Sequence, residues 1–200
     1  PKKRWEKCPL CQKRMRDEGL KNEQELQSYF TQRIEKYLNK KGKKIIGWDE
    51  ILEGGIAPNA AVMSWRGEKG GIAAARQQHC VVMSPSDYCY FCNYQANPQT
   101  EPLAIGGFTP LEKVYNYDPV PAELNDSEAK FILGAQGNVW TEYMGTPQLV
   151  EYMTYPRAAA LSEVVWSPAK MRNYIDFKKR LRNQALRYNA YGMNYCKAEF

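Results

Sequence analysis

Hydrophobic positions in this chain fall into short continuous runs that alternate with longer segments of helical spacing. The continuous runs predict four buried β-strands, near residues 44–48, 59–64, 80–84 and 131–136. Apolar residues spaced by three and four predict helices that lie between Asn22 and Gly42 and near residues 70–77, 110–115, 147–165 and 171–188. The first helix begins at a capping-box-like pair, because Glu25 follows Asn22 by three residues.

Strands that are apolar along their whole length and alternate with helices are typical of a parallel sheet covered on both faces. The predicted fold class is therefore α/β, with the four strands in sequential order and the helices outside. The connection after the third strand is long and rich in proline, but no composition change marks a linker. We expect residues 1–200 to form a single domain.

Aromatic residues stand at or just beyond the end of each predicted strand. They are Trp48, Trp65, Tyr90 and Trp140. In a β/α barrel the C-terminal strand ends form the active face. Aromatic walls with a few polar anchors suit a sugar, whose C–H faces stack on rings while its hydroxyls need hydrogen bonds. The pattern favours a carbohydrate site, and core packing is the alternative for any single one of these side chains.

Composition argues against a disordered protein and against a membrane-spanning one, and it leaves nucleic-acid binding open. With 44% hydrophobic residues, five Trp and fourteen Tyr, the chain is not predicted to be disordered, and no apolar run approaches the length of a membrane span. Residues 1–44 hold fourteen Lys/Arg against six Asp/Glu, whereas residues 45–200 hold fourteen against sixteen. We interpret this basic segment as a solvated helix face with no nucleic-acid partner, although nucleic-acid binding is an alternative.

Six cysteines include two Cys-x-x-Cys pairs, Cys8/Cys11 and Cys89/Cys92. Such pairs can form a zinc site, but zinc ribbons usually separate them by about 15–20 residues. Here 77 residues lie between Cys11 and Cys89. We therefore interpret them as ordinary thiols and expect no metal and no cofactor. The redox compartment stays open.

Six motifs occur in order along the chain: Gly47-Trp48-Asp49-Glu50, Met63-Ser64-Trp65-Arg66-Gly67, Met83-Ser84-Pro85, Tyr90-Phe91, Gly137-Asn138-Val139-Trp140-Thr141-Glu142, and Tyr155-Pro156-Arg157 continuing to Glu163. Together they closely resemble the C-terminal half of the catalytic barrel in family 20 glycoside hydrolases, the β-N-acetylhexosaminidases. The resemblance covers essentially all 200 residues. It implies the C-terminal half of a (β/α)8 barrel, with about four parallel strands and outer helices.

The resemblance also implies where the catalytic acids lie. Residues 1–5 look like the segment that follows the family's catalytic Asp-Glu pair, so that pair is expected immediately before Pro1. A chain that begins at Pro and shows no signal peptide reads as a piece of a longer protein. The first four strands and the proton donor are then expected upstream, and residues 1–200 are expected to be inactive alone.

By the same resemblance, the reaction is substrate-assisted retention, in which the sugar's own N-acetyl oxygen is the nucleophile. Trp48, Trp65 and Trp140 look like the aromatic box around the acetamide, and Tyr90 looks like the hydroxyl that holds the acetamide oxygen. Glu142 looks like the carboxylate that accepts hydrogen bonds from the outer sugar hydroxyls. These side chains are expected to converge on one concavity.

Two positions need separate interpretation. Asp49-Glu50 is an adjacent acidic pair, but it is not the family's catalytic pair, and we expect Asp49 to cap or bridge at the strand end. Cys92 stands where family members commonly carry an Asp that binds a sugar hydroxyl, and it is retained as a substrate-binding position. Because a thiol is a weak acceptor, Asn93 is a possible substitute.

Three functions follow in order of preference. The first is part of a β-N-acetylhexosaminidase acting on N-acetylglucosamine- or N-acetylgalactosamine-containing glycans. The second is a non-catalytic carbohydrate-binding or structural fragment, and the third is a zinc- or nucleic-acid-binding module. The expected partners are the glycan and the missing N-terminal half of the barrel, with self-association through exposed sheet edges as a further expectation. Family habit implies an extracellular or periplasmic location.

Overall fold

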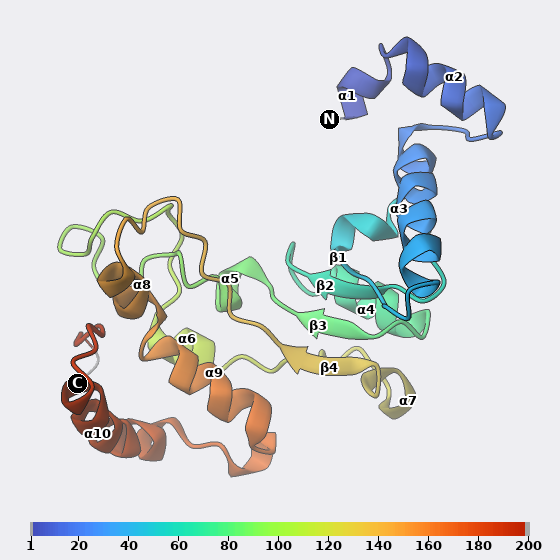
Figure 1. Cartoon of the computed structure of the whole chain (residues 1–200). Helices are drawn as coiled ribbons and strands as arrows, with labels where there is room; N and C mark the ends of the chain where they lie inside the picture. Colours follow the sequence, from blue (N-terminus) through green and yellow to red (C-terminus); the bar gives the residue numbers. More distant parts are fainter. Residues whose placement is uncertain (1, 199–200) are drawn as a thin grey trace. The chain divides into compact units, whose positions relative to one another are not determined.

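The computed structural model describes residues 2–198 of the chain (Figure 1). It divides into two compact units. Unit 1 comprises Pro1–Val82 with Ala122–Leu133, and unit 2 comprises Met83–Pro121 with Gly134–Phe200. The expectation that residues 1–200 form one incomplete barrel domain stays a prediction.

The sheet contains four strands in the order β1-β2-β3-β4, where β1 is Ile46–Trp48, β2 Ala61–Ser64, β3 Val81–Met83 and β4 Ile132–Ala135. β1 and β2 pair in parallel, with Ile46 opposite Ala61 and Trp48 opposite Met63. Val62 N–H donates to Cys80 C=O at 2.9 Å next to the β2–β3 pairing, and Val81 N–H donates to Phe131 C=O at 2.8 Å next to the β3–β4 pairing. The predicted α/β class, the parallel strands and their sequential order are confirmed.

Unit 1 has helices before and between its strands: α1 Lys2–Trp5, α2 Pro9–Asp17, α3 Glu23–Asn39, the 3-10 helix η1 Asp49–Leu52, α4 Lys69–Arg76 and α7 Asp126–Ala129. The predicted start of α3 is confirmed, because the Asn22 side chain accepts a hydrogen bond from Glu25 N–H at 3.0 Å. The Glu25 carboxylate bonds to Lys21 N–H and not to Asn22 N–H. Helices α1 and α2 were not predicted, although Pro9 at the first turn of α2 is a start signal.

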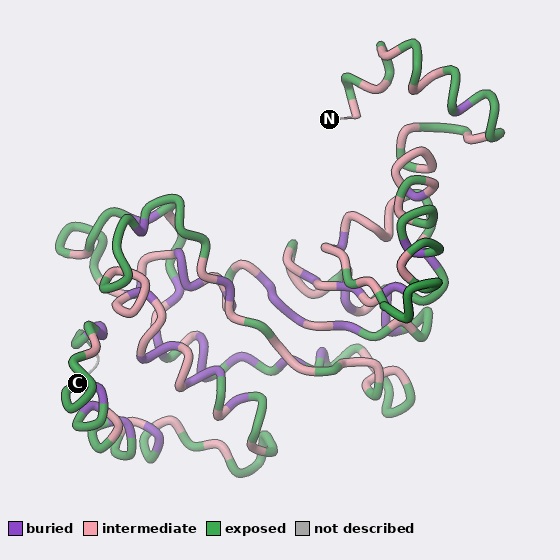
Figure 2. Tube along the Cα trace, in the orientation of Figure 1, coloured by how far each residue is buried: buried purple, intermediate pink, exposed green. Residues whose placement is uncertain are grey.

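The apolar stripe of α3 is largely exposed in unit 1. Phe30 is 65% exposed and Tyr37 is 60% exposed. The buried residues of this helix are Ser28 and Glu35, and the Glu35 carboxylate accepts a hydrogen bond from Asn59 N–H at 2.6 Å. The helical spacing is therefore confirmed, and α3 consists mostly of exposed and partly buried residues (Figure 2).

Unit 2 is mostly helical and contains α5 Ser86–Cys89, α6 Leu111–Tyr115, α8 Pro147–Thr154, α9 Arg157–Trp166, the 3-10 helix η2 Ala169–Met171 and α10 Tyr174–Ala190. The single helix predicted near residues 147–165 is wrong: it is two helices, separated at the cis peptide Tyr155-Pro156. Pro156 has no N–H to continue the hydrogen-bond ladder of α8. The last helix begins at Tyr174, three residues later than predicted, with the Asn173 side chain as its cap.

Candidate carbohydrate-binding site

In unit 1 two tryptophans stand at the ends of neighbouring parallel strands. Trp48 is the last residue of β1, and Trp65 follows directly after β2. Both are half-buried. Their place at the C-terminal strand ends is the one predicted for them, and it comes directly from the parallel pairing of β1 with β2.

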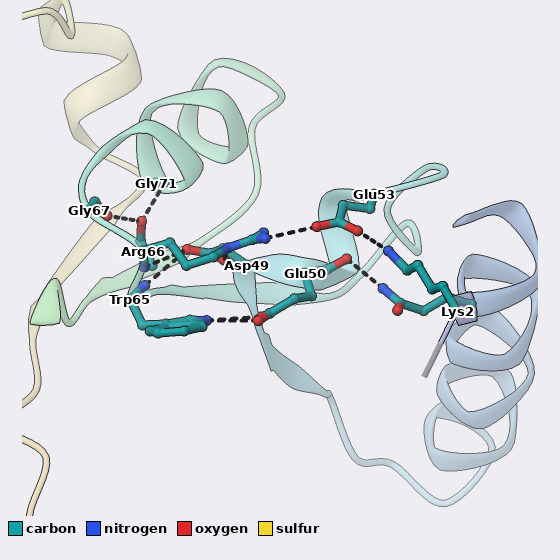
Figure 3. Close-up of polar contacts among 10 residues, drawn as sticks. Lys2, Asp49, Glu50, Glu53, Trp65, Arg66, Gly67 and Gly71 are labelled. Atoms are coloured by element: carbon teal, nitrogen blue, oxygen red, sulfur yellow. Dashed lines mark hydrogen bonds and ion pairs between the residues drawn. The ribbon is translucent and has the colours of Figure 1, made fainter. Parts of the chain in front are cut away.

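Asp49 holds the turn on which Trp65 stands. Its Oδ2 accepts hydrogen bonds from Trp65 N–H at 3.0 Å and Arg66 N–H at 3.1 Å, and its Oδ1 pairs with Arg66 Nε at 2.5 Å (Figure 3). The side chain is 2% exposed. Gly70 lets α4 approach, because a Cβ there would lie 2.8 Å from Asp49 Cβ. The expectation that Asp49 bridges at the strand end is confirmed.

Glu50 orients the indole of Trp65. The indole Nε1–H lies 3.1 Å from Glu50 Oε1 and 3.0 Å from Oε2. Gln27 on α3 donates to the Glu50 backbone carbonyl at 2.7 Å, which ties the acidic turn to the helix. The acidic pair therefore acts on Trp65 twice, through its backbone and through its ring.

An ion-pair chain extends from Asp49 towards the start of the chain. Arg66 pairs with Asp49 and, through Nη1, with Glu53 Oε1 at 2.9 Å, while Glu53 also pairs with Lys2 (Figure 3). The ammonium of Lys2 and the guanidinium of Arg66 lower the pKa of the Glu53 carboxyl. The Arg66 side chain is 44% exposed, so this series of ion pairs extends from the buried Asp49 carboxylate into solvent.

In unit 2 the structure brings Tyr90 and Trp140 together. Their rings meet edge to face, with centroids 6.4 Å apart and planes at 70°. The backbone fixes this contact, because Asn138 N–H donates to Cys89 C=O at 2.7 Å and Phe91 N–H donates to Asn138 C=O at 2.8 Å. Gly137 is required here, since a Cβ would lie 2.5 Å from the Phe91 ring.

The buried side chain of Asn138 forms a polar network with Ser84 and Gln136. Its amide nitrogen donates to Ser84 Oγ at 2.5 Å, and its oxygen accepts from Gln136 Nε2 at 2.7 Å. Ser84 Oγ donates to Gln136 C=O at 2.9 Å. The buried polar groups of Ser84 and Asn138 thereby gain hydrogen-bond partners.

The remaining sequence-predicted residues of unit 2 have contrasting surroundings. Cys92 is 3% exposed and packs in an apolar cluster with Ala104, Met144 and Met153. Burial raises the pKa of its thiol. The amide nitrogen of Asn93 donates to Ser86 C=O and Thr109 Oγ1, while Glu142 is exposed. The sugar-binding roles of Cys92 and Glu142 stay predictions.

Arg157 is a key residue of this site to which the sequence assigned no role. It is fully buried at the first turn of α9 and binds only backbone carbonyls. Nη1 donates to Asn93 and Thr109 at 3.0 Å each, while Nη2 donates to Phe91 and Met153 at 2.5 Å each. The guanidinium lies 5.1 Å from the centroid of the Phe91 ring. It therefore clamps the segment that follows Tyr90.

Desolvation lowers the pKa of Arg157 to about 10. An unpaired buried cation is costly unless its donors are satisfied. Here the fork geometry of the guanidinium matches carbonyls from three separate segments. A lone Arg that follows Pro156 and precedes an apolar run was the only signal for this role in the sequence.

A hollow of about 800 Å³ lies along α9 and α10 in unit 2. None of the predicted sugar-binding residues lines it. The Glu163 carboxylate on its wall accepts from Arg180 Nη1 at 2.7 Å and from the Tyr115 hydroxyl at 2.7 Å. Arg180, followed by Tyr115, lowers the pKa of Glu163. These contacts join α6, α9 and α10.

Across residues 2–198, no group of three or more His, Cys, Asp or Glu side chains is arranged to hold a metal ion. No helix in the same range is long and apolar enough to cross a membrane. What the described residues offer is aromatic surface with fixed polar neighbours, which suits a neutral hydroxylated ligand.

A parallel α/β sheet with aromatic side chains at its C-terminal strand ends is the frame on which β/α-barrel enzymes build their sites. The chain belongs to glycosyl hydrolase family 20, whose catalytic domain it matches over residues 1–169. The resemblance inferred from the six motifs is thereby confirmed.

Similar proteins support the same family. A β-hexosaminidase of Porphyromonas gingivalis is 54% identical over 196 residues, covering 98% of this chain and 25% of the relative. The GH20 exo-β-N-acetylglucosaminidase of Vibrio harveyi, solved in complex with N-acetylglucosamine, is 33% identical with a TM-score of 0.86, covering 96% of this chain and 31% of that one. The chitobiase of Flavobacterium johnsoniae is 29% identical with a TM-score of 0.78, covering 98% and 28%. The chain thus spans about a quarter to a third of the length of these relatives.

Proposed function

We propose that this chain is the substrate-binding part of a β-N-acetylhexosaminidase that removes terminal N-acetylglucosamine or N-acetylgalactosamine from glycans. The observation that carries the proposal is the edge-to-face pair of Tyr90 and Trp140 at the strand ends of a family 20 chain. A hydroxyl on the edge of an aromatic wall is what an acetamide group requires: an apolar surface for its methyl and a donor for its oxygen.

In this function Tyr90 donates a hydrogen bond to the acetamide oxygen and holds it towards the anomeric carbon. Fixing the internal nucleophile next to the reacting carbon is a proximity effect. Trp48, Trp65 and Trp140 pack on the acetamide and the sugar, and Glu142 accepts hydrogen bonds from the outer hydroxyls. Arg157 acts through the backbone and keeps Tyr90 in place.

Hydrolysis also requires a carboxylic acid that protonates the leaving oxygen. We propose that this acid comes from sequence upstream of Pro1; general acid catalysis contributes roughly 10²–10⁴-fold to the rate. We therefore propose that residues 1–200 bind the sugar but need upstream sequence for turnover. The exposed apolar stripe on α3 supports upstream chain, or a second copy, as a covering partner.

The test compares the 200-residue chain with the same chain extended upstream through four further strands, each assayed with an aryl N-acetylglucosaminide. We expect turnover by the extended chain alone. Within it, Tyr90→Phe should slow hydrolysis by about 10²–10³-fold, because the oxygen-binding donor is lost while the ring stays. Tyr191→Phe, at an 82% exposed site, is the matched control and should leave the rate unchanged.

Three outcomes contradict the proposal. Equal turnover by the short and the extended chains would reopen Asp49 and Glu50 as the working acids. Sugar binding by the extended chain without turnover would favour the non-catalytic alternative. A Tyr90→Phe variant with the same rate as the parent would remove Tyr90 from the mechanism.

A further inference from the structure

Two thiols that the carbohydrate site does not use lie together at the start of α2. Cys8 is the residue before the helix, with φ −86° and ψ 114°, and Cys11 is in its first turn. Pro9 lies between them at the first helical position. The helix is nine residues long and is held at its start by Gln12 N–H donating to Cys8 C=O at 3.0 Å.

Cys8 and Cys11 are three residues apart at the start of the same helix. Side chains three residues apart at a helix start have Cβ atoms about 5–6 Å apart, and a disulfide needs about 3.5–4.5 Å. Rotation about a side chain does not move its Cβ atom, so a disulfide needs a small shift of the backbone. Cys8 precedes the helix with extended backbone and can make this shift without unwinding the helix. The same Cys-x-x-Cys placement at a helix N-terminus is used by thiol–disulfide oxidoreductases.

The other thiols of the chain lack these features. Cys89, Cys92 and Cys196 are buried in unit 2, and burial raises the pKa of each thiol. Cys80 is exposed, but its neighbours along the chain are His79 and Val81. Cys8 and Cys11 are both partly exposed, so a reagent in solution can reach them.

The two thiols of the pair also differ from each other. The backbone N–H of Cys11, followed by the Cys11 thiol, lowers the pKa of Cys8. The Cys8 thiol raises the pKa of Cys11, and the nearby carboxylate of Glu23 adds to this. An attacking thiol needs a thiolate, and a resolving thiol needs only to be adjacent.

We propose that Cys8 and Cys11 form a thiol–disulfide exchange site, with Cys8 as the attacking thiol and Cys11 as the resolving thiol. Its substrate class is low-molecular-weight disulfides of the glutathione type. The proposal is independent of the glycosidase function.

The chemistry balances as two exchanges. The Cys8 thiolate attacks one sulfur of the disulfide R–S–S–R, forms a Cys8–S–S–R bond and releases one R–S⁻, which takes up a proton. Cys11 then loses its proton and attacks Cys8 Sγ, which forms the Cys8–Cys11 disulfide and releases the second thiol. The protein is oxidised by two electrons, and the small disulfide is reduced to two thiols.

The disulfide would close a short loop at the turn between α1 and α2. Trp5 C=O already accepts from Cys8 N–H at 3.1 Å and from Gln12 Nε2 at 3.0 Å. Oxidation therefore adds a covalent link to a turn that is already held by the backbone. The fold of unit 1 is expected to persist in both redox states.

The test incubates the reduced 200-residue chain with oxidised glutathione and follows it by intact mass and peptide mapping. We expect the peptide that contains Cys8 and Cys11 to lose both free thiols and to become lighter by two hydrogen atoms, with no glutathione retained. Cys11→Ser should instead keep one glutathione on Cys8, because the resolving thiol is missing. Cys80→Ser is the matched control and should oxidise like the parent.

Two results would overturn the proposal. One is a Cys8–Cys11 peptide that stays reduced while Cys80 takes up glutathione. The other is a Cys11→Ser variant whose Cys8 reacts no faster than Cys80 does in the same chain. Circular dichroism of each variant shows that it is folded, and Ser at either position is compatible with a helix start.

Discussion

The two units fix an aromatic side chain at a strand end by opposite electrostatic means. In unit 1, Trp65 is held by the carboxylates of Asp49 and Glu50, and Arg66 neutralises Asp49. In unit 2, the segment that follows Tyr90 is held by the Arg157 guanidinium, which binds neutral carbonyls. One solution pairs charges and extends into solvent, and the other buries a cation among backbone dipoles.

The difference lies in how each group would respond to loss of its partners. Salt screens exposed charges, and many surface ion pairs contribute less than about 1 kcal/mol. A buried cation has no water to replace its partners, so removal of either side leaves unsatisfied groups. The chain therefore offers a graded series of substitutions, from a fully buried guanidinium to a partly exposed carboxylate.

The largest effect is expected at Arg157. Arg157→Met fills the space with an apolar side chain but leaves the carbonyls of Phe91, Asn93 and Thr109 without donors. We expect the free energy of unfolding to fall by about 3–5 kcal/mol. Arg157→Lys keeps the charge but not the planar fork, so it should lose somewhat less. Urea denaturation gives these values.

Hydrogen exchange localises the effect of Arg157. Amides of residues 90–94 should exchange faster in Arg157→Lys even under conditions where the chain stays folded. Arg187→Met, on the exposed face of α10, is the control and should change stability by less than about 0.5 kcal/mol. Equal losses for Arg157→Met and Arg187→Met would show that the clamp contributes nothing.

Asp49 comes next, because it is buried but faces an exposed partner. Asp49→Ala leaves the N–H groups of Trp65 and Arg66 without an acceptor, and we expect a loss of about 2–4 kcal/mol. Asp49→Asn keeps one oxygen for these N–H groups and should lose less. Asp17→Ala, which removes an exposed pair with Lys13, is the control in urea denaturation. A loss for Asp49→Ala as small as that control would contradict the bridging role.

The sequence predicted the strands and helices better than the long-range contacts of Asp49 and Arg157, because secondary structure leaves a local pattern and these contacts do not. Continuous apolar runs located every strand to within about two residues, and Asn22 located the start of α3. The break between α8 and α9 was signalled by Pro156 but overridden by the apolar spacing on both sides. Helices of four residues, such as α5 and α7, have too few positions to show a period.

The candidate site likewise contains residues that local sequence predicts and residues that it does not. Aromatic residues at strand ends can be read from local order, since they follow apolar runs. The role of Arg157 depends on carbonyls that come from residues 91, 93, 109 and 153, and no local pattern brings these together. The indole contact between Glu50 and Trp65 likewise joins residues that are adjacent only after β1 and β2 pair.

A smaller effect on stability, but a specific one, is expected at Glu50. Glu50→Gln keeps an oxygen for the Trp65 indole but removes its negative charge, so the hydrogen bond weakens. We expect a loss of about 1 kcal/mol. The Nε1–H resonance of Trp65 should shift in a proton–nitrogen spectrum while other indole signals stay in place. With exposed Glu6→Gln as the control, an unmoved Trp65 signal would show that the contact does not form in solution.

The smallest effect is expected at Glu53, where the ion-pair chain reaches solvent. Lys2 and Arg66 lower the pKa of Glu53 below its ordinary value of 4.5, so the folded state favours the charged form. Its stabilisation is therefore fully present above pH 4.5 and is lost as the pH falls through the lowered folded-state pKa. Glu53→Gln should cost less than about 1 kcal/mol at neutral pH, and still less at high salt. Urea denaturation of the parent and of Glu53→Gln over a pH series tests this expectation: the difference between their unfolding free energies should shrink towards acid pH. A difference in unfolding free energy that stays constant with pH would assign the effect of Glu53 to packing. Arg157→Met, in contrast, should lose the same large unfolding free energy at every salt concentration, because the partners of Arg157 are neutral and buried.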